Sequence, residues 1–324
     1  MRAIQIDHHG DADVMQLVEV PIGDPGPGEV RVRHHACGIN FIDVYHRSGL
    51  YPLALPAGLG TEAAGVVDAI GPAVEHLAVG DRVAYVARVP GSYAEARVVS
   101  AASVVKLPDH IEFDAAAAML LKGLTVQYLL RQSRVALAPG DTVLWHAAAG
   151  GVGLLACQWA KAMGLRLIGT AGSDDKCQLA AQHGAAHTIN YRTEDVVARV
   201  RELTGGKGVP VVYDPVGKDT WERSLDCLAP LGLLVSFGNA SGPVPPVNLG
   251  VLAQKGSLYV QRPTLYAYMS SRAATQAMAD ELFAMVADGH IRVPVERRYP
   301  LAEAARAHRE LEARNTTGSG VLVP

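Results

Sequence analysis

Short runs in which apolar and polar residues alternate fill the first third of the chain. The runs VRVRHHACGIN (30–40), AGVVDAI (64–70), DRVAYVA (81–87) and AEARVVS (94–100) each predict a strand, and the glycine- and proline-rich segments between them predict turns. From about residue 110 the pattern changes to an alanine-rich helix, FDAAAAMLLKGLTVQYLLRQ. The first part of the chain is therefore expected to be a small β domain.

A second pattern begins at residue 142, where strand-like and helix-like runs take turns. TVLWHA (142–147) precedes GVGLLACQWAKAMG, and RLIGTAG, HTINY and VPVVYD each precede a helical run, the last of them DTWERSLDCLA (219–229), before LLVSFG and SLYVQ (257–261). Such alternation predicts an α/β fold with a doubly wound parallel sheet. Further on we expect helices over 270–288 and 301–313. A last strand, GVLVP, needs a sheet to join and should return to the first domain.

Composition narrows the class of protein. The chain has 324 residues, 49% of them hydrophobic, which suggests two domains. The net charge is -3 and lysine and arginine do not cluster, so neither nucleic acid nor a membrane surface is expected as a partner. The chain shows neither a long unbroken apolar run nor the apolar core of a secretion signal, which predicts a cytoplasmic protein. The cysteines are far apart in the sequence and are expected to be buried thiols: Cys37, Cys157, Cys177 and Cys227.

The loop HAAAGGVG (146–153) carries the most specific local signal. Set against G-x-G-x-x-G, it has Ala148, Gly150 and Gly153 at the three small positions. The first makes the tight turn, the second lets backbone approach a pyrophosphate, and the third lets the helix pack close to the sheet. A tight strand-to-helix turn would explain the loop equally well by itself. Its place after a strand, before a helix and at the start of the alternating domain favours a dinucleotide site.

The second strand of the alternating domain predicts which dinucleotide binds. An acid for the adenine ribose of NAD is expected about 20 residues after the loop. That count reaches AGS at 171–173, and the two acids at 174–175 come slightly late, before Lys176. The hydroxyl of Ser173 and the ammonium of Lys176 suit a 2′-phosphate, and Tyr191 lies on the same side. The alternative is that the acids only open the next helix. We favour NADPH.

Seven segments together carry a resemblance to a known family. INFIDVYHRSGLYP, GLGTEAAG, LKGLTVQYLL, HAAAGGVG, DPVG, SFGN and TGSGVLVP resemble the zinc-free quinone oxidoreductases, and bacterial NADPH:quinone reductases in particular. These proteins form the zeta-crystallin-like branch of the medium-chain dehydrogenase/reductase superfamily. The resemblance implies a GroES-like β domain (1–123, completed by 263–324) and a Rossmann domain that binds NADPH (124–262).

The resemblance also locates a zinc site that this chain has lost. Zinc-dependent alcohol dehydrogenases of the superfamily have two cysteines and a histidine where this chain has Asn40, Thr61 and the pair Leu121–Lys122. Glu62 remains, but one carboxylate does not hold zinc, so no metal is expected. Oxidising an alcohol needs a strong electrophile such as zinc. Reducing a quinone gives a delocalised oxyanion for which hydrogen-bond donors suffice.

A short helix after Asn40 is expected to carry part of the site. Asn40 reads as its N-cap, Asp43 as the N3 residue of a capping box, and Gly49 as its end. Capping is enough to explain Asp43. The resemblance also implies that Asn40 faces the nicotinamide and that Tyr45 is the first choice of donor, with packing as the alternative for this tyrosine. Lys122 is more simply a partner of Glu62 than a catalytic cation.

The other site residues come from family position. Asn239 follows the fifth strand, and Arg262 lies at the domain junction, where an interdomain ion pair is the alternative role. The resemblance implies three catalytic residues, Tyr45, Asn40 and Arg262, and two substrate-binding residues, Tyr51 and Asn239. It implies a larger cofactor-binding set: Asn40, Thr125, Ala148, Gly150, Gly151, Val152, Gly153, Gly172, Ser173, Lys176, Tyr191, Val216, Phe237, Gly238, Asn239, Asn315 and Ser319.

Three functions stay open at this point. The first is NADPH-dependent reduction of quinones without zinc, by a homodimer that pairs through the edge strand SLYVQ. The second is NADPH-dependent reduction of activated C=C bonds in enones or alkenals. The third is a non-catalytic NADPH-binding protein of the crystallin kind. Tyr45 together with Asn40 favours retained chemistry, and the residues leave open which quinone is used and whether electrons leave singly or in pairs.

Overall fold

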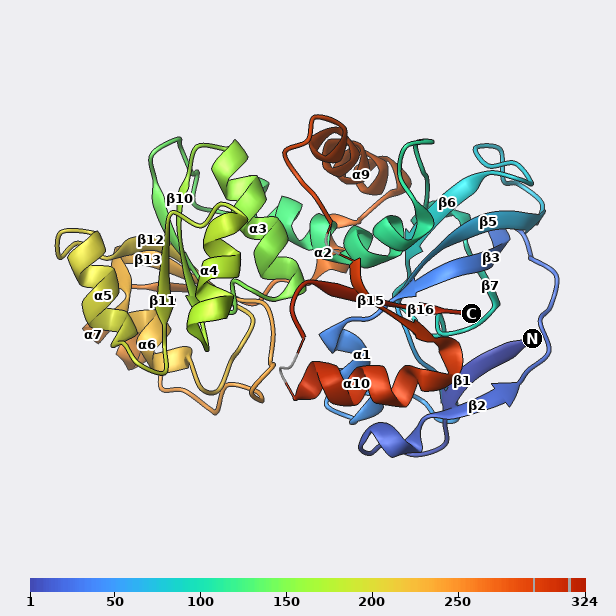
Figure 1. Ribbon diagram of the computed structural model, residues 1–324, viewed down its shortest axis with the longest axis horizontal. Helices are drawn as coiled ribbons and strands as arrows, with labels where there is room; N and C mark the ends of the chain where they lie inside the picture. The colour runs from blue at the N-terminus through green and yellow to red at the C-terminus, as the bar shows by residue number, and fades with distance from the viewer. Residues whose placement is uncertain (294, 314–315) are drawn as a thin grey trace. The chain divides into compact units, whose positions relative to one another are not determined.

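The chain folds into two compact units. The computed structural model describes residues 1–293, 295–313 and 316–324 (Figure 1). The first unit, here the β unit, comprises Met1–Leu124, Met269–Ala287 and Val293–Pro324. The second, here the α/β unit, comprises Thr125–Tyr268 and Asp288–Arg292. The expected domain limits, 1–123 with 263–324 and 124–262, stay a prediction.

Strand β3 (Glu29–Gly38) lies at the centre of the β unit. Val30, Val32 and Ala36 are buried while Arg33 is exposed, so alternate side chains face the core, as the sequence pattern predicts. β3 belongs to a sheet with the order β15-β16-β3-β5-β6-β8, and β7 also pairs with it. The last strand runs antiparallel to β3, with Leu322 opposite Cys37. A smaller sheet has the order β2-β1-β4.

The β unit contains these elements. Its strands are β1 (Arg2–Ile6), β2 (Gln16–Glu19), β3, β4 (Ala57–Gly58), β5 (Glu62–Ile70), β6 (Arg82–Val86), β7 (Ala96–Ser100), β8 (Val104–Lys106), β15 (Val295–Pro300) and β16 (Ser319–Val323). Its helices are α1 (Phe41–Arg47), α9 (Arg272–Ala287) and α10 (Ala304–Glu312), with short 3-10 turns η1 (Ala12–Val14), η2 (Ala101–Ser103) and η3 (Leu301–Glu303). Helix α2 (Phe113–Arg131) carries residues of both units.

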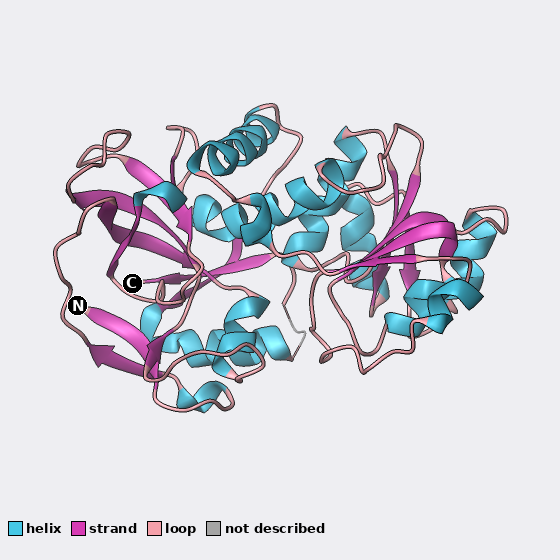
Figure 2. Ribbon diagram, turned by 180° about the vertical axis from the view of Figure 1, so that it is seen from behind, coloured by secondary structure: helices cyan, strands magenta, loops and turns pink. Residues whose placement is uncertain are grey.

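The α/β unit is built on one six-stranded parallel sheet in the order β11-β10-β9-β12-β13-β14. Figure 2 shows helices on both sides of this sheet. Leu144 of β9 pairs with Ile168 of β10 on one side and with Val212 of β12 on the other. Since the strand order reverses beside β9, ligands are expected at the carboxyl end of that strand. This is the doubly wound fold that the alternating pattern predicts, so that prediction is confirmed.

The elements of the α/β unit have these bounds. The strands are β9 (Thr142–Trp145), β10 (Arg166–Ala171), β11 (His187–Asn190), β12 (Val209–Asp214), β13 (Leu228–Ser236) and β14 (Tyr259–Gln261). The helices are α3 (Gly151–Ala162), α4 (Asp174–Gln182), α5 (Val196–Leu203), α6 (Trp221–Asp226), α7 (Gly250–Gln254) and α8 (Leu265–Tyr268).

One predicted helix extends into residues that form a strand. The helix expected over 219–229 ends at Asp226, and Leu228 already belongs to β13. Leu228 pairs with Val209 of the neighbouring strand, so the sheet takes the residues that local pattern assigned to the helix. Tertiary pairing outweighs helical periodicity at this point.

Among the described residues, α2 is the one helix that is long and apolar enough to cross a membrane by length and composition. Of its most apolar window, 78% is buried inside the protein. It therefore reads as a core helix. All four cysteines are free and buried, which confirms that prediction.

Candidate functional site

The loop between β9 and α3 has the shape that a dinucleotide loop requires. Gly150 is the N-cap of α3, and a Cβ on Gly153 would lie 2.5 Å from the carbonyl oxygen of Ala147. No side chain fits at Gly153, so the start of α3 packs directly on the turn. The tight turn itself is made at Ala147, whose φ is 54°, and not at Ala148, where the sequence placed it. Ala148 is fully buried instead, against Gly169 of β10.

A buried network beneath this loop was missed by the sequence analysis. His146 Nδ1 lies 2.9 Å from Thr170 Oγ1, and its Nε2 lies 3.0 Å from Ser224 Oγ. Ser224 donates to Asp214 at 2.8 Å, and Asp214 also accepts from the amide of Val216 at 2.8 Å. The network ties together the ends of β9, β10 and β12, which is where the loop and Val216 are expected to meet the cofactor.

Ser173 and Tyr191 follow the ends of the neighbouring strands β10 and β11, and Lys176 lies in the first turn of α4. Ser173 is the N-cap of α4 and accepts from the Lys176 amide at 3.4 Å. A Cβ on Gly172 would lie 2.6 Å from the Tyr191 hydroxyl, so that ring packs against the turn after β10. Asp174 opens α4 and accepts from the side chain of Asn190 at 2.8 Å. Asp174 and Asp175 thus form the first turn of α4, as the alternative reading expects. The Ser173 hydroxyl, the Lys176 ammonium and the Tyr191 phenol remain the candidates for binding a phosphate.

The segment after β13 is shaped by Arg262. Its Nη1 donates to the carbonyl of Ser236 at 2.8 Å and to that of Gly238 at 3.0 Å. With its amide oriented so that both ends are satisfied, Asn239 donates to Gly238 at 2.9 Å and accepts from Arg262 Nη2 at 3.0 Å. Arg262 thus holds the backbone of the Phe237–Asn239 loop. Its catalytic role, and those of Phe237 and Asn239 in binding, stay predictions.

In the β unit, Glu62 is enclosed by hydrogen-bond donors. It accepts from Asn40 Nδ2 at 2.8 Å and from the Leu121 amide at 2.6 Å, and Lys122 Nζ lies 4.0 Å away. The predicted pairing with Lys122 is confirmed, although the ammonium also donates to the carbonyl of Ile39 at 3.2 Å. Burial raises the pKa of Glu62, and Lys122 and Asn40 oppose that effect. Among the described residues, no three histidine, cysteine or acidic side chains are grouped so as to hold a metal ion.

Asp43 caps α1, as the sequence predicts, but it does more than that. It accepts from the Asn40 amide at 2.9 Å, from Thr61 Oγ1 at 3.2 Å and from the Tyr93 hydroxyl at 2.9 Å. The side chain is fully buried, and burial raises the pKa of Asp43 to about 7. Gly49 follows the helix with φ 79°, which confirms its role at the helix end. Local pattern could not predict the role of Tyr93, since this tyrosine lies in a loop 50 positions away from Asp43.

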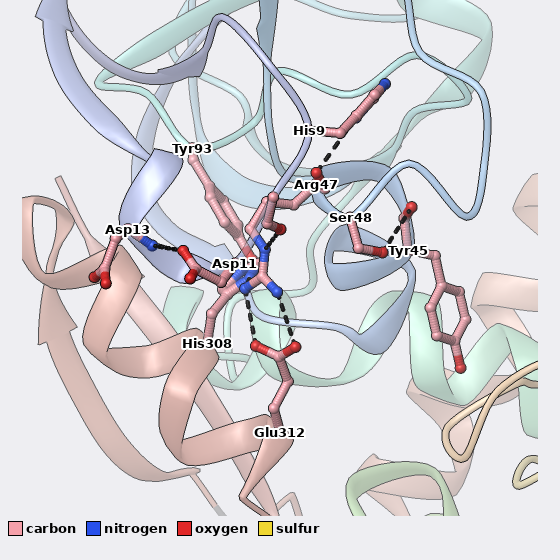
Figure 3. Close-up of polar contacts among 10 residues, drawn as sticks. His9, Asp11, Asp13, Tyr45, Arg47, Ser48, Tyr93, His308 and Glu312 are labelled. Carbon is pink, nitrogen blue, oxygen red and sulfur yellow. Dashed lines mark hydrogen bonds and ion pairs between the residues drawn. The ribbon is translucent and has the colours of Figure 1, made fainter.

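Tyr45 and Tyr51 form an aromatic pair. Their ring centroids are 5.1 Å apart in an edge-to-face arrangement, and the Tyr51 amide donates to the Tyr45 carbonyl at 3.0 Å. Tyr45 is buried and Tyr51 half-buried. Figure 3 shows the Tyr45 ring pointing away from Arg47 and His308. The ring is therefore part of a packed cluster, while the role of its hydroxyl stays a prediction.

The remaining expected cofactor residues have separate positions. Thr125 is buried in α2 and is the first residue of the α/β unit. Ser319 is buried at the start of β16 in the β unit, where it pairs with Val295. Asn315 lies outside the described residues. The proposed contacts of these three residues with the cofactor stay predictions.

Comparisons with known proteins agree with this architecture. Residues 26–109 match the family model of the alcohol dehydrogenase GroES-like domain, and residues 151–283 match that of the zinc-binding dehydrogenases. The quinone oxidoreductase of Pseudomonas aeruginosa is 59% identical over 324 residues, which cover 100% of this chain and 99% of that protein. The 2-haloacrylate reductase of a Burkholderia species is 44% identical over 99% of this chain and 98% of that protein.

A solved structure is similar throughout. The crystal structure of Escherichia coli quinone oxidoreductase complexed with NADPH matches with a TM-score of 0.98 at 53% identity, over 100% of both chains. The GroES-like domain, the Rossmann domain and the resemblance read from the seven sequence segments are thereby confirmed. The chain belongs to the quinone oxidoreductase family of the medium-chain dehydrogenase/reductase superfamily.

Proposed function

We propose that the protein is an NADPH:quinone oxidoreductase that works without zinc. The observation that carries the proposal is the 59% identity to a quinone oxidoreductase over the whole chain. A relative at 53% identity has been solved in complex with NADPH. The replaced ligand positions around Glu62 agree with an acceptor that needs no metal to stabilise its oxyanion.

The residues of the α/β unit fit a dinucleotide. Gly150 and Gly153 leave room for backbone to approach a pyrophosphate, and the first turn of α3 offers free amides at a positive helix end. Ser173, Lys176 and Tyr191 would hold the 2′-phosphate, with Lys176 as the cation. This set favours NADPH over NADH, and the carboxylate of Asp174, which follows Ser173, is bound to Asn190.

In the β unit, Tyr45 is the proposed donor. Bound NADPH supplies the hydride for the reaction. Negative charge then grows on a quinone carbonyl oxygen, and a donor aimed at that oxygen stabilises the transition state more than the ground state. Asn40 is held by Glu62 and Asp43 beside the same helix. The contribution of Asn239 and Arg262 to that carbonyl stays a prediction.

A second candidate is reduction of an activated C=C bond. It is favoured by the 44% identity to a 2-haloacrylate reductase. Purified protein incubated with NADPH and, in separate reactions, with quinones, enones and 2-haloacrylate would distinguish the two. We expect quinones to give the highest kcat/KM. A higher value for enones or haloacrylate would favour the second candidate, and tight NADPH binding without turnover of any acceptor would favour a crystallin-like protein.

The proposal includes a homodimer in the cytoplasm. Strand β14 is the edge of the parallel sheet, and Tyr259 and Val260 on it are exposed by 59% and 40%. Leu231, on the neighbouring strand, is exposed by 63%. An apolar unpaired edge is suited to pairing with a second copy. Four free buried cysteines suit a reducing compartment.

A further inference from the structure

A row of polar side chains, buried except for Glu312, connects α10 with the start of α1 inside the β unit. Glu312 accepts from Arg47 Nη1 and Nη2 at 2.9 and 2.8 Å, and Arg47 Nη1 also lies 3.2 Å from His308 Nδ1. His308 Nε2 lies 3.1 Å from the hydroxyl of Tyr93, which is 2.9 Å from Asp43 Oδ2. Figure 3 shows Arg47 between the carboxylate of Glu312 and the ring of His308, with Tyr93 beside that ring. We call this row the α10–α1 chain.

The hydrogen bonds of the α10–α1 chain can run in one direction only. A guanidinium has donors and no acceptor, so His308 Nδ1 must accept from Arg47. The proton of the neutral imidazole is then on Nε2, which donates to the oxygen of Tyr93. The hydroxyl proton of Tyr93 is left for Asp43. Burial and Arg47 lower the pKa of His308 to about 3, so the ring stays neutral near pH 7.

The α10–α1 chain orients its side chains but does not conduct protons. A proton relay needs every member to accept and release a proton, and arginine does not release one in proteins. Arg47 is 2% exposed, and His308, Tyr93 and Asp43 are fully buried, whereas the side chain of Glu312 is 37% exposed. One end of the chain is thus anchored at the surface by a bidentate ion pair, and the other end delivers a donor to Asp43.

Asp43 transmits this arrangement to two positions of the lost zinc site. It holds the backbone amide of Asn40 at 2.9 Å and the hydroxyl of Thr61 at 3.2 Å. The side chain of Asn40 in turn donates to Glu62. The other titratable groups that face Asp43 are Tyr93 before β7, Glu62 on β5, Cys37 on β3 and Lys122 on α2.

We propose that Arg47, His308 and Tyr93 are positioning residues for the reductase reaction. Because their hydrogen bonds run in one direction, the Tyr93 hydroxyl donates to Asp43, and Asp43 acts as an acceptor. As an acceptor, Asp43 holds the amide of Asn40 and the hydroxyl of Thr61 in place. The effect on catalysis rests on the proposed function. The direction of the hydrogen bonds in the α10–α1 chain does not depend on the proposed function. The direction and the effect on catalysis are therefore tested separately.

The direction is tested by the nitrogen shifts of histidine in the full-length protein. Protein labelled with 15N-histidine is recorded between pH 6 and 8, and the His308 signals are assigned by their loss in His308→Gln. We expect a protonated Nε2 and a bare Nδ1 throughout. In Arg47→Met we expect this preference to disappear. A wild-type signal with the proton on Nδ1, or with both nitrogens protonated, would overturn the proposal.

The effect on catalysis is tested by the pH dependence of kcat/KM. Tyr93→Phe removes a donor to the Asp43 carboxylate and should raise the pKa of that carboxyl, because the ionised form loses a hydrogen bond. The loss of activity on acidification should then begin about one to two pH units higher than in the wild type. An unchanged profile in Tyr93→Phe contradicts the proposal.

Two variants of His308 distinguish a role in hydrogen-bond direction from a role in packing alone. In His308→Gln the amide NH2 can donate to Tyr93 and the amide oxygen can accept from Arg47, so a profile close to the wild type is expected. His308→Leu fills the space without either bond and should shift the profile upward. Equal profiles for the two would reduce His308 to packing. Arg309→Gln is the control for changes in α10, because Arg309 lies on that helix and forms an exposed ion pair with Asp13 of η1. A wild-type protein without reductase activity would overturn the proposed function, while the nitrogen shifts would still decide the direction.

Discussion

By the family resemblance, zinc-dependent relatives have their metal ligands at the positions of Asn40, Thr61 and the pair Leu121–Lys122 in this chain. Asn40 offers an amide, Thr61 a hydroxyl and Lys122 a cation, and Asn40 and Lys122 face the carboxylate while Thr61 is bonded to Asp43. A cation so close to Glu62 competes with a metal ion for the same charge. At the scale of single residues, hydrogen bonds and one ion pair therefore occupy these positions in place of metal ligands.

This chemistry predicts that the protein functions without zinc. We expect purified protein to contain far less than stoichiometric zinc, and we expect chelator treatment to leave quinone reduction unchanged. Metal analysis and activity before and after dialysis against a chelator would test this. Stoichiometric zinc together with activity lost on chelation would show that the prediction is wrong.

The hydroxyl of Tyr45 is predicted to stabilise the reacting carbonyl. Tyr45→Phe keeps the ring that packs against Tyr51 and removes only the donor. We expect kcat/KM for quinones to fall by about ten- to a thousandfold, within the range for loss of one oxyanion donor. The affinity for NADPH should be unchanged and serves as the control. If kcat/KM stays the same for every quinone tested, Tyr45 has a packing role alone.

Lys176 is predicted to distinguish NADPH from NADH. Lys176→Ala removes one charge-assisted contact to the 2′-phosphate and should weaken NADPH binding by about ten- to a hundredfold, whereas NADH binding should change little. Titration calorimetry with both cofactors measures the difference. Lys207→Ala removes the same charge from an exposed loop before β12 and is the matched control. Equal weakening of both cofactors by Lys176→Ala would count against the assignment.

At the scale of elements, the loop between β9 and α3 depends on a missing side chain. A Cβ on Gly153 would meet backbone atoms at 2.5 and 2.6 Å, and backbone cannot move aside as a flexible side chain can. Gly153→Ala should therefore lower the free energy of unfolding by about 1–3 kcal/mol and weaken NADPH binding. Chemical denaturation and calorimetry measure the two effects. Gly23→Ala, where nothing lies within 4 Å of the new Cβ, should change stability by less than about 0.5 kcal/mol.

Local pattern predicts the elements well and the long-range contacts poorly. The cap at Asn40, the helix end at Gly49 and the strand at TVLWHA depend on neighbours within a few residues, and each is confirmed. The predicted end of α6 was wrong because Leu228 pairs with Val209 of β12, which lies outside the local sequence pattern.

The same limit applies to the site. The pairing of Lys122 with Glu62 was predicted because a lysine within an apolar helical run needs a buried carboxylate as its partner. Tyr93 and His308 were missed, since a loop tyrosine and a helical histidine carry no local sign of a bond to each other across 215 positions. The network around His146 was missed for the same reason.

At the scale of the whole molecule, the exposed edge of the parallel sheet predicts the assembly. Among the described residues, strand β14 has one strand neighbour, β13, so no other described strand pairs with its second edge. Two copies related by a twofold axis can pair these edges antiparallel, because the same patch then faces itself. Tyr259 and Val260 would be covered by that contact. We therefore expect a dimer of two 34.2 kDa chains at micromolar concentration.

A charge placed on this edge should separate the two copies. Val260→Lys puts two like charges close to each other across the twofold axis and adds a charge of the kind that protects natural edge strands from pairing. We expect light scattering to give twice the chain mass for the wild type and a single chain mass for Val260→Lys. Val79→Lys changes a 64% exposed valine of the β unit and should remain a dimer. A monomeric wild type, or a Val260→Lys variant that remains dimeric, would show that the copies do not associate through β14.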